Sequence, residues 1–179
     1  TGASNTAVGQ GALAQNTTAD YNVAIGVDAM NANTTGNQNV VVGSLALDAN
    51  TTGIYNVAIG HLALSGNTTA GKNVAVGHAS LRFNSTGANN VALGTNALAS
   101  NTTASNNTAI GKDALTANTT GAQNTAVGQG ALKSNTTAAY NVAMGYLALE
   151  DNVTGGNNVA VGSFALEGNT GSNNTAVGD

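Results

Sequence analysis

A block of 17 residues returns along the whole chain, and this repeat constrains the fold more than any other feature. Numbered from Thr1, position 5 is Asn and position 9 is Gly in all eleven units, and position 16 is Asn in all ten units that reach it. Position 13 is Leu in nine of ten units, with Met30 as the exception. A fixed short period is typical of units that cannot bury their own apolar side chains and stack on their neighbours instead.

The repeat predicts one solenoid over residues 1–179, made of about ten and a half coils. Because the chain starts at a unit boundary and stops inside a unit, we expect it to be part of a longer fibre protein. Residues that recur at one position should stack into ladders that join coil to coil. The structural ladder includes Asn5, Asn22, Asn39 and Asn56 at position 5, Gly9, Gly26 and Gly43 at position 9, and Leu13, Leu47 and Leu64 at position 13.

Composition excludes several classes of protein. Aromatic residues make up 3% and charged residues 7% of the chain, which argues against the thick core of a globular enzyme. Cysteine is absent, so disulfides and thiolate metal sites are excluded, and the net charge of −4 is too mild and scattered for a nucleic-acid or polybasic membrane surface. We therefore expect no enzyme, no catalytic residue, no cofactor, no metal site, no nucleic-acid partner and no membrane segment.

Positions 5 to 9 alternate as a short strand does. In the unit around Val57, Ala58 and Ile59, the two large side chains point one way and the alanine points the other. We expect the Val and Ile columns to lie in the core and the Ala column to face outward. Positions 12, 13 and 16 carry Ala, Leu and Asn, a spacing that favours a short helical segment over positions 10 to 16.

Each coil then buries only about three large apolar side chains. At roughly 1.5 to 3 kcal/mol each, they barely offset the cost of ordering 17 residues. A lone rod is therefore weakly stabilised, and the small uncharged column of Ala7, Ala24 and Ala58 would let a second chain approach closely. We therefore expect copies of the chain to associate with one another, either as a closed homotrimer or as an end-to-end polymer.

The repeat resembles known fibre proteins. Residues 107–111 (Asn-Thr-Ala-Ile-Gly) and 141–145 (Asn-Val-Ala-Met-Gly) are similar to the inner-strand motif of trimeric autotransporter adhesin head repeats. The full unit, with Ala-Leu followed by Asn-Thr-Thr-Gly, is more similar to repeats of bacteriophage and prophage tail-fibre proteins. The resemblance implies a parallel, left-handed, trimeric β-solenoid (a β-roll) in an extracellular fibre of a virion tail or cell surface. It also implies a receptor or glycan partner bound by other regions of the fibre.

Two kinds of residue could carry chemistry on such a rod. His61 and His78 share position 10 of consecutive coils, close enough to share a metal ion or to act as a pH-sensitive pair, although two exposed histidines without function are the plainer interpretation. Nine position-16 asparagines head glycosylation sequons, and the alternative is that they cap turns inside the stack. These asparagines are Asn16, Asn33, Asn50, Asn67, Asn84, Asn101, Asn118, Asn135 and Asn152.

Three functional hypotheses follow from these features. The first is a structural or adhesive fibre segment that provides length, rigidity and display. The second is the subunit of a self-assembling extracellular filament, with sugars on the sequons as a further option. The third, a minor one, is an ice- or surface-binding solenoid that uses the Thr columns at positions 17 and 1. Tyr21, Tyr55 and Tyr140 share position 4 but lie in coils two, four and nine, which disfavours a continuous sugar-binding groove.

Overall fold

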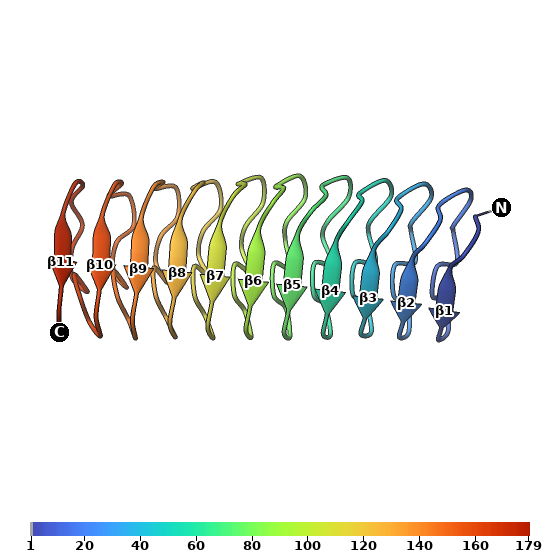
Figure 1. The fold of residues 1–179 in the computed structure, drawn as a ribbon, viewed down its shortest axis with the longest axis horizontal. Coiled ribbons are helices and arrows are strands. Elements are labelled where there is room, and N and C mark those ends of the chain that lie inside the picture. Colours follow the sequence, from blue (N-terminus) through green and yellow to red (C-terminus); the bar gives the residue numbers. More distant parts are fainter. Residues whose placement is uncertain (1) are drawn as a thin grey trace.

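The computed structural model describes residues 2–179 as one rod of stacked coils with a single parallel sheet along its length (Figure 1). The eleven strands lie in sequence order, and the two chain ends lie at opposite ends of the rod. The strands are β1 (Thr6–Val8), β2 (Val23–Ile25), β3 (Val40–Val42), β4 (Val57–Ile59), β5 (Val74–Val76), β6 (Val91–Leu93), β7 (Thr108–Ile110), β8 (Thr125–Val127), β9 (Val142–Met144), β10 (Val159–Val161) and β11 (Thr175–Val177).

The pairing register confirms the parallel β-solenoid of 17-residue coils. Val57 pairs with Val74, 17 residues later, and the same offset joins the strands from β1 to β10. The last step is one residue shorter, since Val159 pairs with Thr175. At roughly 4.8 Å between neighbouring strands, the sheet is roughly 50 Å long.

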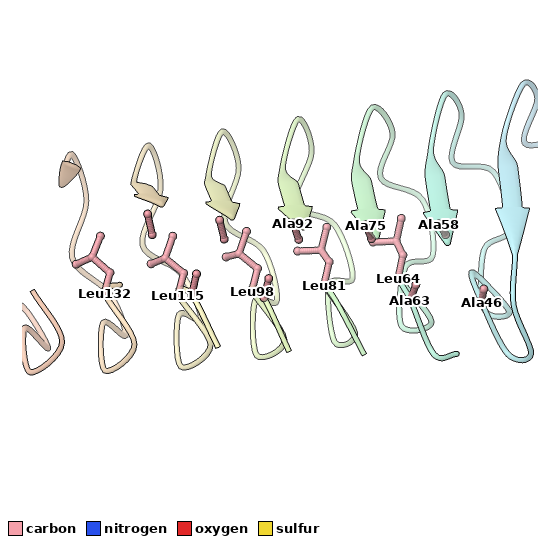
Figure 2. Packing of buried hydrophobic residues seen from close by; sticks show 14 of the residues in the cluster. Ala46, Ala58, Ala63, Leu64, Ala75, Leu81, Ala92, Leu98, Leu115 and Leu132 are labelled. Carbon is pink, nitrogen blue, oxygen red and sulfur yellow. The ribbon is translucent and has the colours of Figure 1, made fainter. Parts of the chain in front are cut away.

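The core is a narrow file of alanine and leucine inside the coils. Ala58 from the strand and Ala63 and Leu64 from the opposite side of the same coil are fully buried, and their equivalents repeat in the coils on either side. Figure 2 shows the leucines reaching toward the strand alanines along the rod. Met30 takes the leucine position in its coil and is equally buried. Stacking identical small cores therefore gives one continuous hydrophobic cluster.

The predicted orientation of the strands is wrong. Ala58 at the strand centre is fully buried, whereas Val57 is only partly buried and Ile59 is 39% exposed. The physical reason is space. Because Leu64 crosses the narrow interior, the facing strand position takes a small side chain, alanine in nearly every coil and valine at Val41, and the large side chains at positions 6 and 8 point outward. The alternation of a three-residue strand was read correctly, but it does not state which face is inside.

The helical segment predicted for positions 10 to 16 is also wrong, since residues 2–179 contain no helix and this segment is a run of turns. Leu62 and Leu64 both have positive φ, 60° and 55°, with a residue of ordinary φ between them. The amide of Ala63 donates to Gly60 O within the coil, while the amide of Leu64 donates to Ser80 O of the next coil. The helical spacing identified the buried residues but not their backbone.

Glycine at position 9 is required by the sharp exit from each strand. Gly60 has φ of 129°, and a Cβ atom on it would lie 2.6 Å from the carbonyl oxygen of Gly77 in the next coil. A side chain would be strained by the φ angle and would also push the two backbones apart.

Residues 2–179 include no apolar helix of membrane-spanning length.

Candidate functional site

The outer face of the sheet has a uniform chemistry along the rod. We call it the aliphatic face and define it as positions 6 and 8 of strands β1 to β11. Of its 22 side chains, 18 are Val, Ile, Leu or Met and the other four are Thr. Ile25, Ile59 and Ile110 are 38%, 39% and 37% exposed, although each lies in the interior of the sheet. No position on this face carries a charge.

This aliphatic face was missed by the sequence analysis because Val and Ile were assigned to the core. The signal that could have identified it is volume. A coil that also contains an inward Leu and two inward Ala has no room for two further large side chains. Contiguous exposed apolar surfaces on soluble proteins mark sites of interaction, so the face is the leading candidate for a binding surface.

The asparagines at position 5 form a ladder that ties the coils together. The amide of Asn73 donates to the side-chain oxygen of Asn56 at 3.0 Å, and the Asn56 side-chain nitrogen donates to the Ala70 carbonyl at 3.0 Å. The same amide-to-oxygen bond continues through every step from Asn5 to Asn174. These buried polar groups therefore satisfy one another along the rod.

The position-16 asparagines form a second ladder beside the first. Asn67 donates to Asn50 Oδ1 at 2.9 Å and to the Ala70 carbonyl at 3.0 Å, the same carbonyl that Asn56 uses. Hydrogen bonds between successive position-16 side chains continue in this way from Asn16 to Asn135. It ends there, because Asn152 bonds only to the Gly155 carbonyl and the Asn135 oxygen is left without a partner.

This geometry favours turn caps over glycans at the sequons. Eight of the nine sequon asparagines are fully buried, and Asn16 is partly buried. The side-chain nitrogen, where a sugar would be attached, already donates hydrogen bonds, as Asn67 does. A folded coil therefore presents none of the eight buried sequons to solvent.

The two histidines are brought together as predicted. The imidazoles of His61 and His78 stack with centroids 5.5 Å apart and planes inclined by 25°. The described chain has no group of three or more His, Cys, Asp or Glu side chains placed to hold a metal ion. The three position-4 tyrosines, Tyr21, Tyr55 and Tyr140, are exposed but lie beside β2, β4 and β9, so they form no shared surface.

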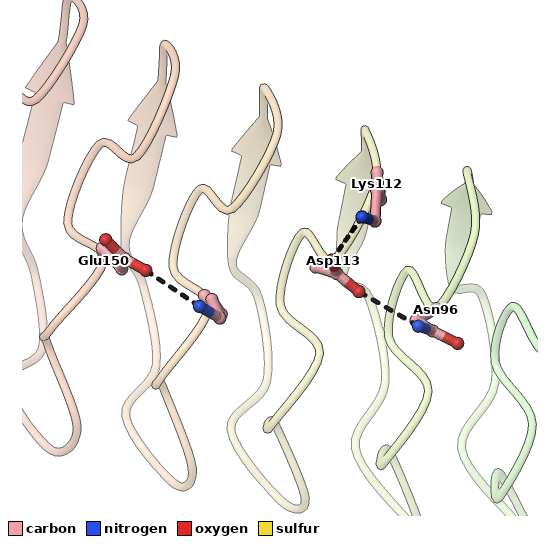
Figure 3. Close-up of polar contacts among 5 residues, drawn as sticks. Asn96, Lys112, Asp113 and Glu150 are labelled. Atoms are coloured by element: carbon pink, nitrogen blue, oxygen red, sulfur yellow. Dashed lines mark hydrogen bonds and ion pairs between the residues drawn. The ribbon is translucent and has the colours of Figure 1, made fainter.

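Charged side chains occupy repeat positions 3, 4, 10, 11, 14 and 15, outside the aliphatic face. Lys133 Nζ pairs with Glu150 Oε1 at 3.0 Å across two coils, and the hydrogen bond from Glu150 raises the lysine pKa. Lys112 lies 3.8 Å from Asp113, whose other oxygen accepts a 3.1 Å bond from Asn96 (Figure 3). These exposed pairs contribute little to stability.

Asp48, at repeat position 14, is the one acidic residue within residues 2–179 whose surroundings clearly shift its pKa. It is partly buried, and its Oδ1 atom is buried without a hydrogen-bond partner. Burial raises the pKa of this carboxyl, with a smaller contribution from the charge of Asp28, while the backbone amides of Asp48 and Ala49 oppose the shift. The buried carboxyl of Asp48 therefore lowers the stability of the fold locally, and we assign it no role in a reactive site.

Comparison with protein-family models, with curated proteins and with solved structures gives no match for this chain. No pocket is found on the described residues. The rod itself, its aliphatic face and the stacked histidines are therefore the features that bear on function.

Proposed function

We propose that this chain is a rigid segment of an extracellular fibre and that copies of it associate side by side through the aliphatic face. One observation carries the proposal: two columns of partly or fully exposed Val, Ile, Leu, Met and Thr side chains run without a charge along all eleven strands. An isolated rod leaves this stripe in water, and a second copy offers a surface of the same length and chemistry.

The free energy of association would grow with the number of coils. Fully burying an Ile or Val side chain is worth roughly 1.5 to 3 kcal/mol, so covering the 39% of Ile59 that remains exposed is worth roughly 0.6 to 1.2 kcal/mol. The translational and rotational cost of association, roughly 4 to 15 kcal/mol, is paid once for the whole chain. A long repetitive stack therefore associates where a few coils would not.

We take three as the number of chains, arranged around one axis with the left-handed coil that the fibre resemblance implies. Three aliphatic faces turned toward a common axis make a closed assembly in which each copy has the same surroundings. The alanine column cannot serve as this interface, because Ala24, Ala58 and their equivalents lie inside the coils. The assembly would supply reach and stiffness, and receptor or glycan binding would belong to other parts of the fibre.

The ice-binding alternative receives no support from the threonine columns. At position 17, the hydroxyl of Thr34 donates to the carbonyl of Thr51 at 3.0 Å, and Thr51 and Thr119 make the equivalent bond to their next coils. These hydroxyls are used to join coils rather than to present a flat hydroxyl surface.

The test is the solution mass of the chain by light scattering over a dilution series. We expect a constant mass of three chains. Ile110→Lys places a charge on the aliphatic face and should reduce the mass to one chain, whereas Gln129→Lys, at an exposed position outside that face, should leave three.

Two results would count against this proposal. A wild-type mass of one chain, or an unchanged mass for Ile110→Lys, would exclude association through the aliphatic face. A mass that rises continuously with concentration would instead favour the end-to-end filament.

A further inference from the structure

His61 and His78 lie side by side at repeat position 10, in coils four and five. Each follows the strand-ending glycine of its coil, Gly60 or Gly77, and each is exposed. Their ring centroids lie 5.5 Å apart. Within residues 2–179, neither imidazole takes part in a hydrogen bond or an ion pair, so the ring nitrogens have no competing protein partner.

The backbone holds this pair in place. Ala79 donates its amide to the His61 carbonyl at 3.0 Å, and Asn96 donates to the His78 carbonyl at 3.1 Å. The strands β4 and β5 end at Ile59 and Val76, two residues before His61 and His78, and are paired in parallel register. The two side chains therefore start roughly 4.8 Å apart, and only their own rotations change the distance between the rings.

We propose that His61 and His78 form a two-imidazole site for a divalent transition-metal ion such as Cu²⁺, Ni²⁺ or Zn²⁺. Imidazole nitrogen is a preferred ligand of these ions. At a metal–nitrogen distance of about 2.0 to 2.1 Å for zinc, two nitrogens on opposite sides of one ion lie at most about 4.2 Å apart. Exposed rings with centroids 5.5 Å apart reach that separation by tilting their edges toward each other.

The surroundings of the pair select against harder ions. The neighbouring position-10 residues are Ser44 and Thr95, which carry no carboxylate, and the following residues Leu62 and Ala79 are apolar. Ca²⁺ and Mg²⁺ require several oxygen ligands and should not bind. Among ions that accept imidazole, Cu²⁺ should bind more tightly than Ni²⁺ or Zn²⁺, with water completing the coordination. The site lies within one chain and does not depend on the proposed fibre assembly.

Calorimetric titration of the purified chain with CuCl₂, and separately with ZnCl₂ and MgCl₂, tests the proposal. We expect one Cu²⁺ or Zn²⁺ per chain and no binding of Mg²⁺. His61→Gln and His78→Gln should each weaken Cu²⁺ binding at least about tenfold, because loss of a supporting partner alone commonly costs that much. The double variant should bind Cu²⁺ less than about tenfold more weakly than either single variant, because one remaining histidine cannot chelate the ion.

A relocation experiment separates a stacked pair from the mere presence of two histidines. In the His78→Gln background, Ser44→His places a new imidazole beside His61, whereas Gln129→His places one four coils away at the same repeat position. The first change should restore binding and the second should not. Equal thermal midpoints without metal would show that the variants fold alike.

Three results would overturn the proposed site. They are full affinity in either single variant, restoration by the distant histidine, or failure of the adjacent histidine to restore binding.

Discussion

The side-chain oxygen of Asn56 accepts a hydrogen bond from the backbone amide of Asn73, 3.0 Å away in the next coil. The Asn56 nitrogen meanwhile donates to the carbonyl of Ala70, which also accepts a hydrogen bond from the Asn67 side chain. Both partners are buried. A side chain that is shorter or lacks the amide cannot replace these bonds.

We therefore expect Asn56→Ala to destabilise the chain by about 1 to 3 kcal/mol, because the buried amide of Asn73 is left without a partner, whereas the Ala70 carbonyl keeps its bond from Asn67. Urea unfolding followed by circular dichroism measures the change. Ser100→Ala is the matched control, since Ser100 lies at a partly exposed position and its hydroxyl makes no hydrogen bond to the described chain. Equal midpoints for the two variants would contradict a structural role for the ladder.

How far the sequence alone could predict this fold depends on the kind of residue. Asn56 and Gly60 could be recognised as structural residues, because only one residue type meets the backbone requirement at each position. That requirement appears in the sequence as a column in which the residue never changes. The strand around Ala58 was located correctly for a similar reason, since its alternation has period two. Its orientation could not be read, because three residues give the same alternation whichever face is buried.

Leu64 illustrates the second limit. Its spacing from Asn67 correctly placed both residues in the interior, but the spacing is also that of a helix. The actual backbone has Leu64 at a positive φ of 55°, which a bulky residue rarely adopts. The tertiary gain from burying leucine in a continuous core outweighs that local preference. The spacing therefore predicted the wrong backbone. The aliphatic face was missed for a separate reason, because the orientation of the strands was predicted wrongly.

Gly77 provides a test of the corner geometry. Its φ is 133°, and a Cβ atom would lie 2.7 Å from the carbonyl carbon of Gly94. Gly77→Ala should therefore cost about 3 kcal/mol or more, from backbone strain together with displacement of the next coil. In Gly168→Ala the added methyl group meets no atom within 4 Å, so the stability should be unchanged or slightly raised. Similar losses in both variants would exclude the corner as the cause.

Position 4 offers a route to a more stable chain. Gln123 is exposed and has φ of 59°, a conformation that costs residues with a Cβ atom roughly 1 to 2 kcal/mol. After the greater chain entropy of glycine in the unfolded state is subtracted, Gln123→Gly should stabilise the chain by about 0.5 to 1 kcal/mol. Ser100→Gly, at a position without positive φ, should lower stability instead. Thermal melting of both variants decides whether the sign depends on φ.

Asp48 makes stability depend on pH in an unusual direction for an acidic residue. Burial raises its pKa in the folded chain above the ordinary value of 3.8, so the folded state holds this proton more tightly than the unfolded state does. Stability from this group is therefore gained as the pH falls through the raised pKa, and the cost is fully present at neutral pH. Asp48→Asn removes the charge and should raise the urea midpoint at pH 7.

The gain from Asp48→Asn should shrink as the pH is lowered and disappear below the ordinary pKa of 3.8, where the carboxyl is protonated in both the folded and unfolded states. Asp179→Asn makes the same change in net charge at an exposed residue near the chain end and should shift the midpoint at neither pH. Urea titrations at pH 7 and pH 3 measure both variants. A gain of equal size at the two pH values would show that the charge of Asp48 is not what limits stability.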